Sequence, residues 1–205
     1  MAVASLTKIT VPLSSDQSTS TQGLLMPNLQ YRFRVTLENF GVSTPRTELT
    51  KNVISCGRPN VSFDPIDIHV YNSKAKLIGK PNWADITITF RDDVNNNVTK
   101  LVGEQLQKQF DYFEQSSASS GIDFKFTVRL ETLDGGNGAF GANVIETWEL
   151  YGCHLISVNY GQFDYSAVEP NTIECTIALE NALQTPLGTG VGTDIGRALG
   201  SVITG

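Results

Sequence analysis

The sequence predicts a mainly β protein, an antiparallel β-sandwich or barrel with one α-helix on its flank. Three observations lead to this fold class. Most of the chain between residues 27 and 185 alternates apolar and polar residues, a single segment has helical periodicity, and strands precede and follow that helix. Because one helix among strands has to bury its apolar stripe, it must cover a face or an edge of a sheet. At 205 residues the chain is long enough for one such domain.

Four strands are predicted before the helix. The two clearest are residues 31–37 and 83–90, in which every second residue is apolar. Residues 53–56 form a short strand that ends at a turn, and residues 66–72 form a further possible strand within a long excursion. One face of the fourth strand is expected to consist of Ala84, Ile86, Ile88 and Phe90.

The helix is predicted at about residues 95–115. Asp93, Asn95 or Asn97 can cap its N-terminus. The neighbouring acids Asp92 and Asp93 are interpreted as helix-stabilising, because a carboxylate near a helix N-terminus interacts favourably with the helix dipole. A catalytic pair of carboxylates is the less favoured interpretation. The core-facing stripe is expected to be Val98, Leu101, Val102, Leu106, Phe110 and Phe113.

Further strands are predicted after the helix. Residues 124–131 alternate in the same way, and the glycine-rich turn at residues 134–138 connects them to a strand at 144–151. Strands at about 155–160 and 172–182 complete the domain. Cys175 alternates with aliphatic residues in the last of these strands and is expected to be a small core residue.

Two extensions flank the predicted domain. Residues 1–26 are rich in Ser and Thr, and residues 186–205 are rich in Gly, so both are expected to be flexible. Within the first, residues 6–11 alternate and could pair with another strand. No signal-peptide pattern is evident at the N-terminus and no apolar run is long enough to span a bilayer, which predicts a soluble, non-exported chain.

Composition and motifs argue against several function classes. A net charge of −6, with no run of Lys or Arg, disfavours electrostatic binding to a nucleic-acid backbone. Three widely spaced cysteines and two histidines form no metal-binding or disulfide pattern. No nucleophile elbow or phosphate-binding loop is present. We therefore expect no enzymatic activity, no cofactor and no metal, and a structural role for His154.

Two aromatic residues lie off the apolar faces of their predicted elements. Trp83 and Tyr112 are candidates for an interface, although a solvent-shielding surface position is an equal alternative. A carbohydrate-binding or carbohydrate-degrading β-sandwich is a further hypothesis that the aromatic content permits. However, no exposed aromatic platform or carboxylate pair can be named for it.

Three segments resemble a known family over roughly residues 27–183. They are Pro27-Asn28-Leu29 before the first strand, residues 83–93 with the strand, acidic turn and helix start, and the final pair of residues 151–157 and 174–179. In these segments the chain resembles the tail tube proteins of contractile-tailed bacteriophages. The segment 83–93 is the most specific, because tube proteins commonly carry a strand of this pattern that begins with Trp and is followed by acids and a helix.

The resemblance implies a structural virion protein. Such subunits form stacked hexameric rings whose sheets join into an inner β-barrel, the conduit for genome delivery inside a contractile sheath. Implied partners are other copies of the chain, the tail sheath, baseplate, tail terminator and tape measure proteins, and DNA that passes transiently without specific binding. The implied location is the virion tail, assembled in the host bacterial cytoplasm. The alternative is the inner tube of a type VI secretion or extracellular contractile injection system.

Under this resemblance, exposed residues of the strands and the helix become candidates for the lumen or for contacts between subunits. An acidic chain suits a conduit, since a wall that attracted phosphates would retard DNA. The candidate residues are Trp83, Asp85, Thr87, Thr89, Tyr112, Glu131, Glu146 and Glu149.

Overall fold

The computed structural model describes residues 28–42, 47–134 and 142–185. The chain divides into two compact units, residues 1–32 and 33–205, and every helix and strand described lies in the second. In the first unit the Arg32 N–H donates to the Leu29 carbonyl over 3.1 Å. Tyr31, which was predicted to begin a strand, lies in this turn. Both predicted extensions, including the alternating residues 6–11, lie outside the described residues.

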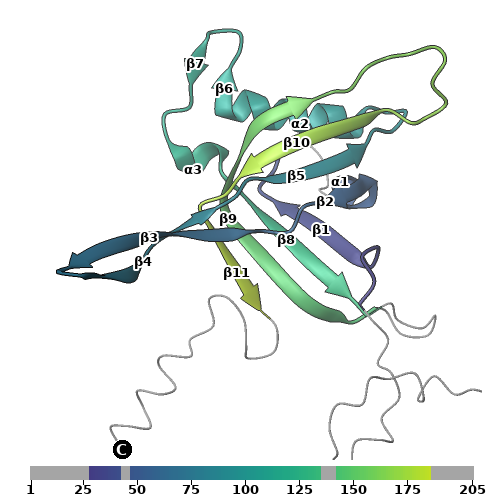
Figure 1. Ribbon diagram of the computed structural model, residues 1–205. Helices are drawn as coiled ribbons and strands as arrows, with labels where there is room; N and C mark the ends of the chain where they lie inside the picture. The colour runs from purple at the N-terminus through teal and green to yellow at the C-terminus, as the bar shows by residue number, and fades with distance from the viewer. Residues whose placement is uncertain (1–27, 43–46, 135–141, 186–205) are drawn as a thin grey trace, which may run out of the picture. The chain divides into compact units, whose positions relative to one another are not determined.

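The fold is mainly β and antiparallel, as the sequence predicts, and its helices are few (Figure 1). The helices are α1 (Thr47–Asn52), α2 (Asn97–Gln109) and α3 (Gly121–Phe124). The strands in the described ranges are β1 (Phe33–Glu38), β2 (Val53–Cys56), β3 (Val61–Val70), β4 (Ser73–Trp83), β5 (Ile86–Arg91), β6 (Phe110–Asp111), β7 (Ser116–Ser117), β8 (Phe126–Leu133), β9 (Val144–Asn159), β10 (Thr172–Ala178) and β11 (Asn181–Thr185).

Two four-stranded layers share the long strand β9. The first sheet has the order β1-β8-β9-β11, and the second sheet has the order β9-β10-β5-β2. The strand passes from one sheet to the other near Gly152, whose φ is +67°. Glycine adopts this left-handed conformation without the steric cost that a side chain adds, which suits it to the corner of a strand.

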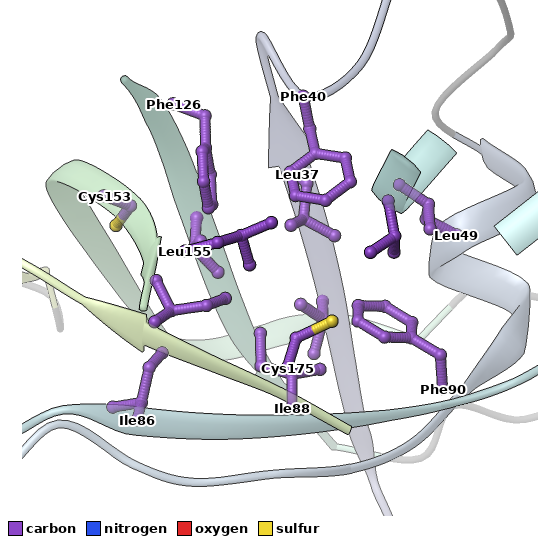
Figure 2. Close-up of a cluster of buried hydrophobic side chains, with 14 of the residues drawn as sticks. Leu37, Phe40, Leu49, Ile86, Ile88, Phe90, Phe126, Cys153, Leu155 and Cys175 are labelled. Carbon is purple, nitrogen blue, oxygen red and sulfur yellow. The ribbon is translucent and has the colours of Figure 1, made fainter. Parts of the chain in front are cut away.

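The inner faces of the two sheets form one core. Figure 2 shows inner side chains of both sheets, such as Leu37, Ile88 and Cys175, gathered around a common interior. Phe40 and Phe126 meet edge to face with ring centroids 4.9 Å apart. Since Cys175 is fully buried in this cluster, its predicted core position is confirmed.

Helix α2 packs its buried side chains against the core. Val98, Leu101 and Val102 are fully buried in the core cluster. Gln105 is also buried, and its amide accepts from the Gly41 N–H after β1 and donates to the Phe124 carbonyl before β8. At the next turn, the Gln109 amide both donates to the Leu155 carbonyl and accepts from the Leu155 N–H, each over 2.9 Å. The helix is therefore tied to the sheets by amide bonds as well as by apolar contacts.

The start of α2 confirms the interpretation of Asp93. Its carboxylate accepts hydrogen bonds from the Asn97 N–H at 2.8 Å and from Asn97 Nδ2 at 2.6 Å. The hydrogen bond from the backbone N–H of Asn97 is the main cause that holds the pKa of Asp93 below its ordinary value. Asp92 accepts a hydrogen bond from the Thr99 hydroxyl. These acids stabilise the helix start, although the N-cap residue itself is Asn96, which makes no side-chain cap bond.

The predicted elements differ from the observed ones in several places. The helix ends at Gln109 because Phe110 turns to an extended conformation, so Phe113 leaves the core stripe and is 94% exposed. The predicted strand 83–90 is broken at residues 84–85. The predicted strands 144–151 and 155–160 are one strand, and the predicted strand 172–182 is two. Helices α1 and α3 are too short to show a clear helical periodicity in the sequence.

Candidate assembly surfaces

The β3–β4 hairpin is an amphipathic ribbon. Its register places Ile66 opposite Leu77, Ile68 opposite Ala75, and Val70 opposite Ser73. Directly opposed residues of an antiparallel pair project to the same side of the sheet. One side therefore carries Ile66, Ile68, Val70, Ala75 and Leu77, which we name the apolar face of the hairpin. The other side carries Asp67 opposite Lys76 and His69 opposite Lys74.

The described residues leave the apolar face of the hairpin uncovered. Its Ile, Val and Leu side chains are 43–55% exposed. In Figure 1 the two strands reach out from the rest of the 33–205 unit, and among the described strands each pairs only with the other. Because a two-stranded hairpin is marginally stable in water and a contiguous exposed apolar patch marks an interaction site, this ribbon is a candidate interaction surface.

The root of the hairpin is held firmly. Trp83 packs against the core, and the Ala84 N–H donates to the Asn60 carbonyl over 2.9 Å. Arg58, three residues before β3, forms an ion pair with Glu146 of β9. The same carboxylate accepts from the Trp148 indole at 2.6 Å and from Gln184 at 2.5 Å. The hairpin is thus an arm with an ordered attachment to both sheets.

A second candidate surface lies along the outer strands of the first sheet. Neither β1 nor β11 has a second neighbour among the described strands. Each step in the order β1-β8-β9-β11 is antiparallel, so β1 and β11 run in opposite directions. Therefore the β11 of one copy can pair with the β1 of the next in the same antiparallel sense. The second sheet lacks this property, because one side continues into the first sheet through β9 and the other ends at the short strand β2.

The outer face of the first sheet is covered by paired charges. Arg34 pairs with Glu131 across 2.5 Å. Arg129 contacts both Glu38 at 3.3 Å and Glu149 at 3.0 Å. The Tyr151 hydroxyl donates to Glu149, which raises the pKa of the phenol. The carboxylates of this face are largely compensated by arginines.

The outer face of the second sheet is rich in hydroxyl groups and poor in charge. The register places Thr176 opposite Thr87, Glu174 opposite Thr89, and Thr172 opposite Arg91. Ser55 lies opposite Thr89 on one side, and Ser157 lies opposite Thr176 on the other. The two sheets therefore present chemically different outer surfaces.

The predicted candidate residues fall on several surfaces. Trp83 is half-buried at the hairpin root, and Asp85 is exposed in the break between β4 and β5. Thr87 and Thr89 lie on the outer face of the second sheet. Tyr112 is exposed after α2, with its ring edge-on to Phe110 at 5.2 Å.

The three glutamates divide between the two faces of the first sheet. Register places Glu131 opposite Thr147, and Arg129 opposite Glu149, so Glu131 and Glu149 share the outer face. Glu146 lies opposite Thr132 on the other face. The structure thus brings Glu131 and Glu149 together and separates them from the remaining candidates. Sequence reasoning missed the apolar face of the hairpin, whose signal was the alternation of Ile66, Ile68 and Val70.

The described residues contain no cluster of side chains suited to a metal or redox site. In the ranges that the structure describes, no three His, Cys, Asp or Glu side chains gather as metal ligands would. Burial raises the pKa of Cys56, Cys153 and Cys175 to about 12, which disfavours the thiolate form that reacts and binds metals. The Nδ1 of His154 is buried without a hydrogen-bond partner, and its ring lies edge-on to Phe124. Within the same ranges no helix is long and apolar enough to cross a membrane.

Comparison with known proteins defines the class of fold. No protein-family model and no curated protein matches the chain. Solved structures do match: a chain of the anti-feeding prophage cap, described as the AFP tube terminating cap, has a TM-score of 0.58 and 16% identity, and covers 83% of this chain and 98% of that chain.

Two further solved structures are similar. A chain of the anti-feeding prophage baseplate has a TM-score of 0.59 and 11% identity, and covers 81% of this chain and all (100%) of that chain. A chain of the PVC sheath-tube complex, from an extracellular contractile injection system in the extended state, has a TM-score of 0.55 and 15% identity. It covers 85% of this chain and 100% of that chain. The protein therefore shares its fold with components of contractile tail assemblies.

Proposed function

We propose that this chain is a structural subunit that assembles with copies of itself into stacked rings, the inner tube of a contractile tail. The observation that carries the proposal is the pair of oppositely directed outer strands of the first sheet, β1 and β11, neither of which has a second neighbour among the described strands. Pairing these edges between copies removes two exposed edges from every subunit, a liability that sheet proteins otherwise have to protect. The fold shared with a chain of the PVC sheath-tube complex supports the proposal.

Such pairing is heterologous, because β11 of one subunit meets a different strand, β1, of the next. A heterologous contact closes into a ring when its rotation divides a full turn, and otherwise forms an open helix. We propose the closed case, as a hexamer, which is the stoichiometry that the tail-tube resemblance implies. The first sheets of the subunits then form one continuous antiparallel barrel.

The outer face of the first sheet would line the lumen of this barrel. Glu131 and Glu149 would face the cargo, while Thr87 and Thr89 would lie on the second sheet, away from it. The paired charges of this face modify the prediction of an acidic wall: the carboxylates are present, but Arg34 and Arg129 compensate them. A wall of this kind has few uncompensated cations to bind phosphates, so a polyanion would pass without strong adhesion.

The bacteriophage tail is the machine that the sequence resemblance favours. In it the tube would conduct the genome and contact the sheath, baseplate, tail terminator and tape measure proteins. The second candidate is the inner tube of an extracellular contractile injection or type VI secretion system, since one of the three similar structures is a chain of an extracellular contractile injection system. The neighbouring genes separate the two, because capsid and terminase genes are expected only beside a phage tail gene.

Negative-stain electron microscopy of the purified full chain tests the proposal. We expect rings or tubes with one uniform bore, and a sedimentation coefficient that rises with concentration. A species that remains strictly monomeric at the highest attainable concentration would contradict self-assembly. Binding of glycans by such a monomer would instead favour a carbohydrate-binding β-sandwich.

A further inference from the structure

We propose that Glu146 is a positioning residue, which fixes the direction of the β3–β4 hairpin relative to the first sheet and so prepares the subunit for assembly. The part that concerns assembly rests on the proposed function. Glu146 was a candidate for the lumen or for a contact between subunits, and the structure assigns it a role inside the subunit instead.

The hairpin follows the second sheet through a short linker, residues 57–60, which lies between β2 and β3. The Gly57 N–H donates to the Thr87 carbonyl of β5 at 2.8 Å, and the Asn60 carbonyl accepts from the Ala84 N–H just before β5. Both backbone bonds attach the linker on the side of the second sheet. They do not set the angle between the hairpin and the first sheet, which would form the wall of the proposed barrel.

Glu146 connects the linker to the first sheet by directional bonds. Its Oε1 accepts from the Trp148 indole of β9 at 2.6 Å and from Gln184 of β11 at 2.5 Å, while its Oε2 forms the ion pair with Arg58 of the linker. Hydrogen bonds to an ionised acceptor are stronger than those between neutral groups, and the planar guanidinium adds geometric specificity. The packing of Trp83 against the core is non-directional by comparison. Glu146 therefore supplies an angular restraint that apolar contact does not.

The surroundings of Glu146 favour a role in geometry over a role in stability. Its side chain is only 14% exposed, and a carboxylate in such a place has to be paired with donors. Trp148 and Gln184 already supply two donors from the first sheet. The Arg58 side chain is 66% exposed, and an ion pair with so exposed a partner adds little to the stability of a fold. The bond to Arg58 therefore acts mainly on where the linker lies.

The same carboxylate holds both candidate assembly surfaces. Gln184 belongs to β11, the strand that is proposed to pair with β1 of the next copy, and Arg58 belongs to the linker of the hairpin. One side chain thus sets the hairpin in a defined direction relative to the joining strand. An arm that is already directed loses less conformational entropy on association than one that swings freely, so assembly becomes more favourable.

The direction of the hairpin can be measured by double electron–electron resonance on the full chain, at a dilution at which it is monomeric. Nitroxide labels are attached at Lys74→Cys on the hairpin and at Asn181→Cys on β11, two exposed positions. Burial raises the pKa of the native Cys56, Cys153 and Cys175 to about 12, so brief labelling at neutral pH favours the introduced thiols. In this doubly labelled parent we expect one narrow distribution of distances.

Two variants remove the restraint and one serves as the matched control. Arg58→Ala and Glu146→Gln should each replace the narrow distribution by a broad one. Arg34→Ala removes an ion pair with Glu131 on the outer face of the same sheet and should leave the distribution narrow. Arg58→Ala decides the test if Glu146→Gln fails to fold, because the exposed Arg58 side chain contributes little to the folded core.

Sedimentation of the unlabelled proteins tests the consequence for assembly. Arg58→Ala should melt close to the parent and yet need about 10-fold more protein for half-maximal assembly, because the arm has lost its preorganisation. A narrow distribution in Arg58→Ala, an equally broad one in Arg34→Ala, or unchanged assembly of Arg58→Ala would each overturn the inference while the parent still forms rings or tubes. Absence of assembly by the parent would overturn the proposed function instead, whereas the distances in the dilute monomer would still decide whether Glu146 directs the hairpin.

Discussion

The packed sheets and the β3–β4 hairpin have the same sequence pattern and opposite surroundings. Ile86, Ile88 and Phe90 of β5 alternate with polar residues and are fully buried in the core between the sheets. Ile66, Ile68 and Val70 of β3 alternate in the same way and remain about half exposed. Alternation therefore indicates that one side of a strand is apolar, but it does not indicate whether other residues of the same chain bury that side. The hairpin is the part of the described chain whose alternating apolar side has no such cover.

Substitution of a core aromatic residue should give the largest effect on the folded subunit. Phe90→Ala removes a fully buried ring and leaves a cavity, so we expect the free energy of unfolding to fall by about 3–5 kcal/mol. Ile68→Ala in the hairpin removes a side chain that water already reaches. It should leave the stability of the monomer within about 0.5 kcal/mol while weakening assembly. Urea denaturation of dilute monomer measures the stability of both variants, and sedimentation at high concentration measures their assembly. Equal destabilisation by Phe90→Ala and Ile68→Ala would contradict the difference between the core and the hairpin.

Loss of the Gln109 amide should give the next largest effect. Gln109→Ala leaves the N–H and carbonyl of Leu155 without their hydrogen-bond partner, at a cost of about 1–3 kcal/mol. Gln107→Ala is the matched control two residues earlier, because Gln107 is exposed and bonds Asp111 at the surface. Thermal denaturation of both variants checks this. Similar melting temperatures for the two variants would show that the hydrogen bonds between Gln109 and Leu155 do not contribute to stability.

Two Gly→Ala substitutions should have different effects, one on assembly through the hairpin and the other on stability through the helix. A Cβ at Gly79 would lie 2.1 Å from the Asp64 carbonyl oxygen, so Gly79→Ala must distort the hairpin and should abolish assembly without unfolding the sheets. A Cβ at Gly103 would meet no atom within 4 Å, so Gly103→Ala in α2 should stabilise the subunit by about 1 kcal/mol. Circular dichroism melts and electron microscopy are the measurements. Normal tubes from Gly79→Ala would show that the hairpin geometry does not matter.

The smallest effect should appear at acidic pH. Because the folded pKa of Asp93 lies below its ordinary value, folding favours the charged carboxylate. This contribution is present above the unfolded pKa and is lost as pH falls below about 4 towards the folded pKa. Asp93→Asn should therefore reduce stability at neutral pH and flatten its dependence on pH between about 5 and 2. A variant with an unchanged profile would show that Asp93 does not stabilise the helix start.

The sequence predicted the parts of the fold that alternation or helical periodicity specifies. The strands around residues 33–37 and 126–131 and the buried half of α2 follow this rule, since each covers one face of the core. The continuity of β9 through the corner at Gly152 was missed, since residues 144–151 and 155–160 were predicted as separate strands. A glycine between two alternating segments can mark a bend within one strand, which no local pattern distinguishes from the end of a strand. The polar segment Ser73–Lys76 was taken for an excursion because its pairing with β3 depends on contacts that no local pattern reveals.

Among the candidate residues, too, some positions could be predicted from the sequence and others could not. Glu146 and Glu149 were grouped as acids, but an odd spacing along a strand puts two residues on opposite faces, and the register does so here. That separation could have been read from the sequence. The ion pairs of Arg129 with Glu38 and Glu149 could not, because they join strands that lie far apart in the chain.

The pairing of β11 with β1 of the next copy is the central claim, and a charge-swap pair tests it most directly. Thr36 of β1 and Leu183 of β11 lie in one cross-strand row on the outer face of the first sheet, through Arg129 and Glu149. The proposed joint would continue this row from β11 of one copy to β1 of the next and so place the two side chains opposite each other. Electron microscopy of Thr36→Glu/Leu183→Lys should show rings, because opposite charges meet across each joint. Thr36→Lys/Leu183→Lys should remain a folded monomer, because like charges opposed across strands repel. Equal assembly of the two variants would contradict the claim.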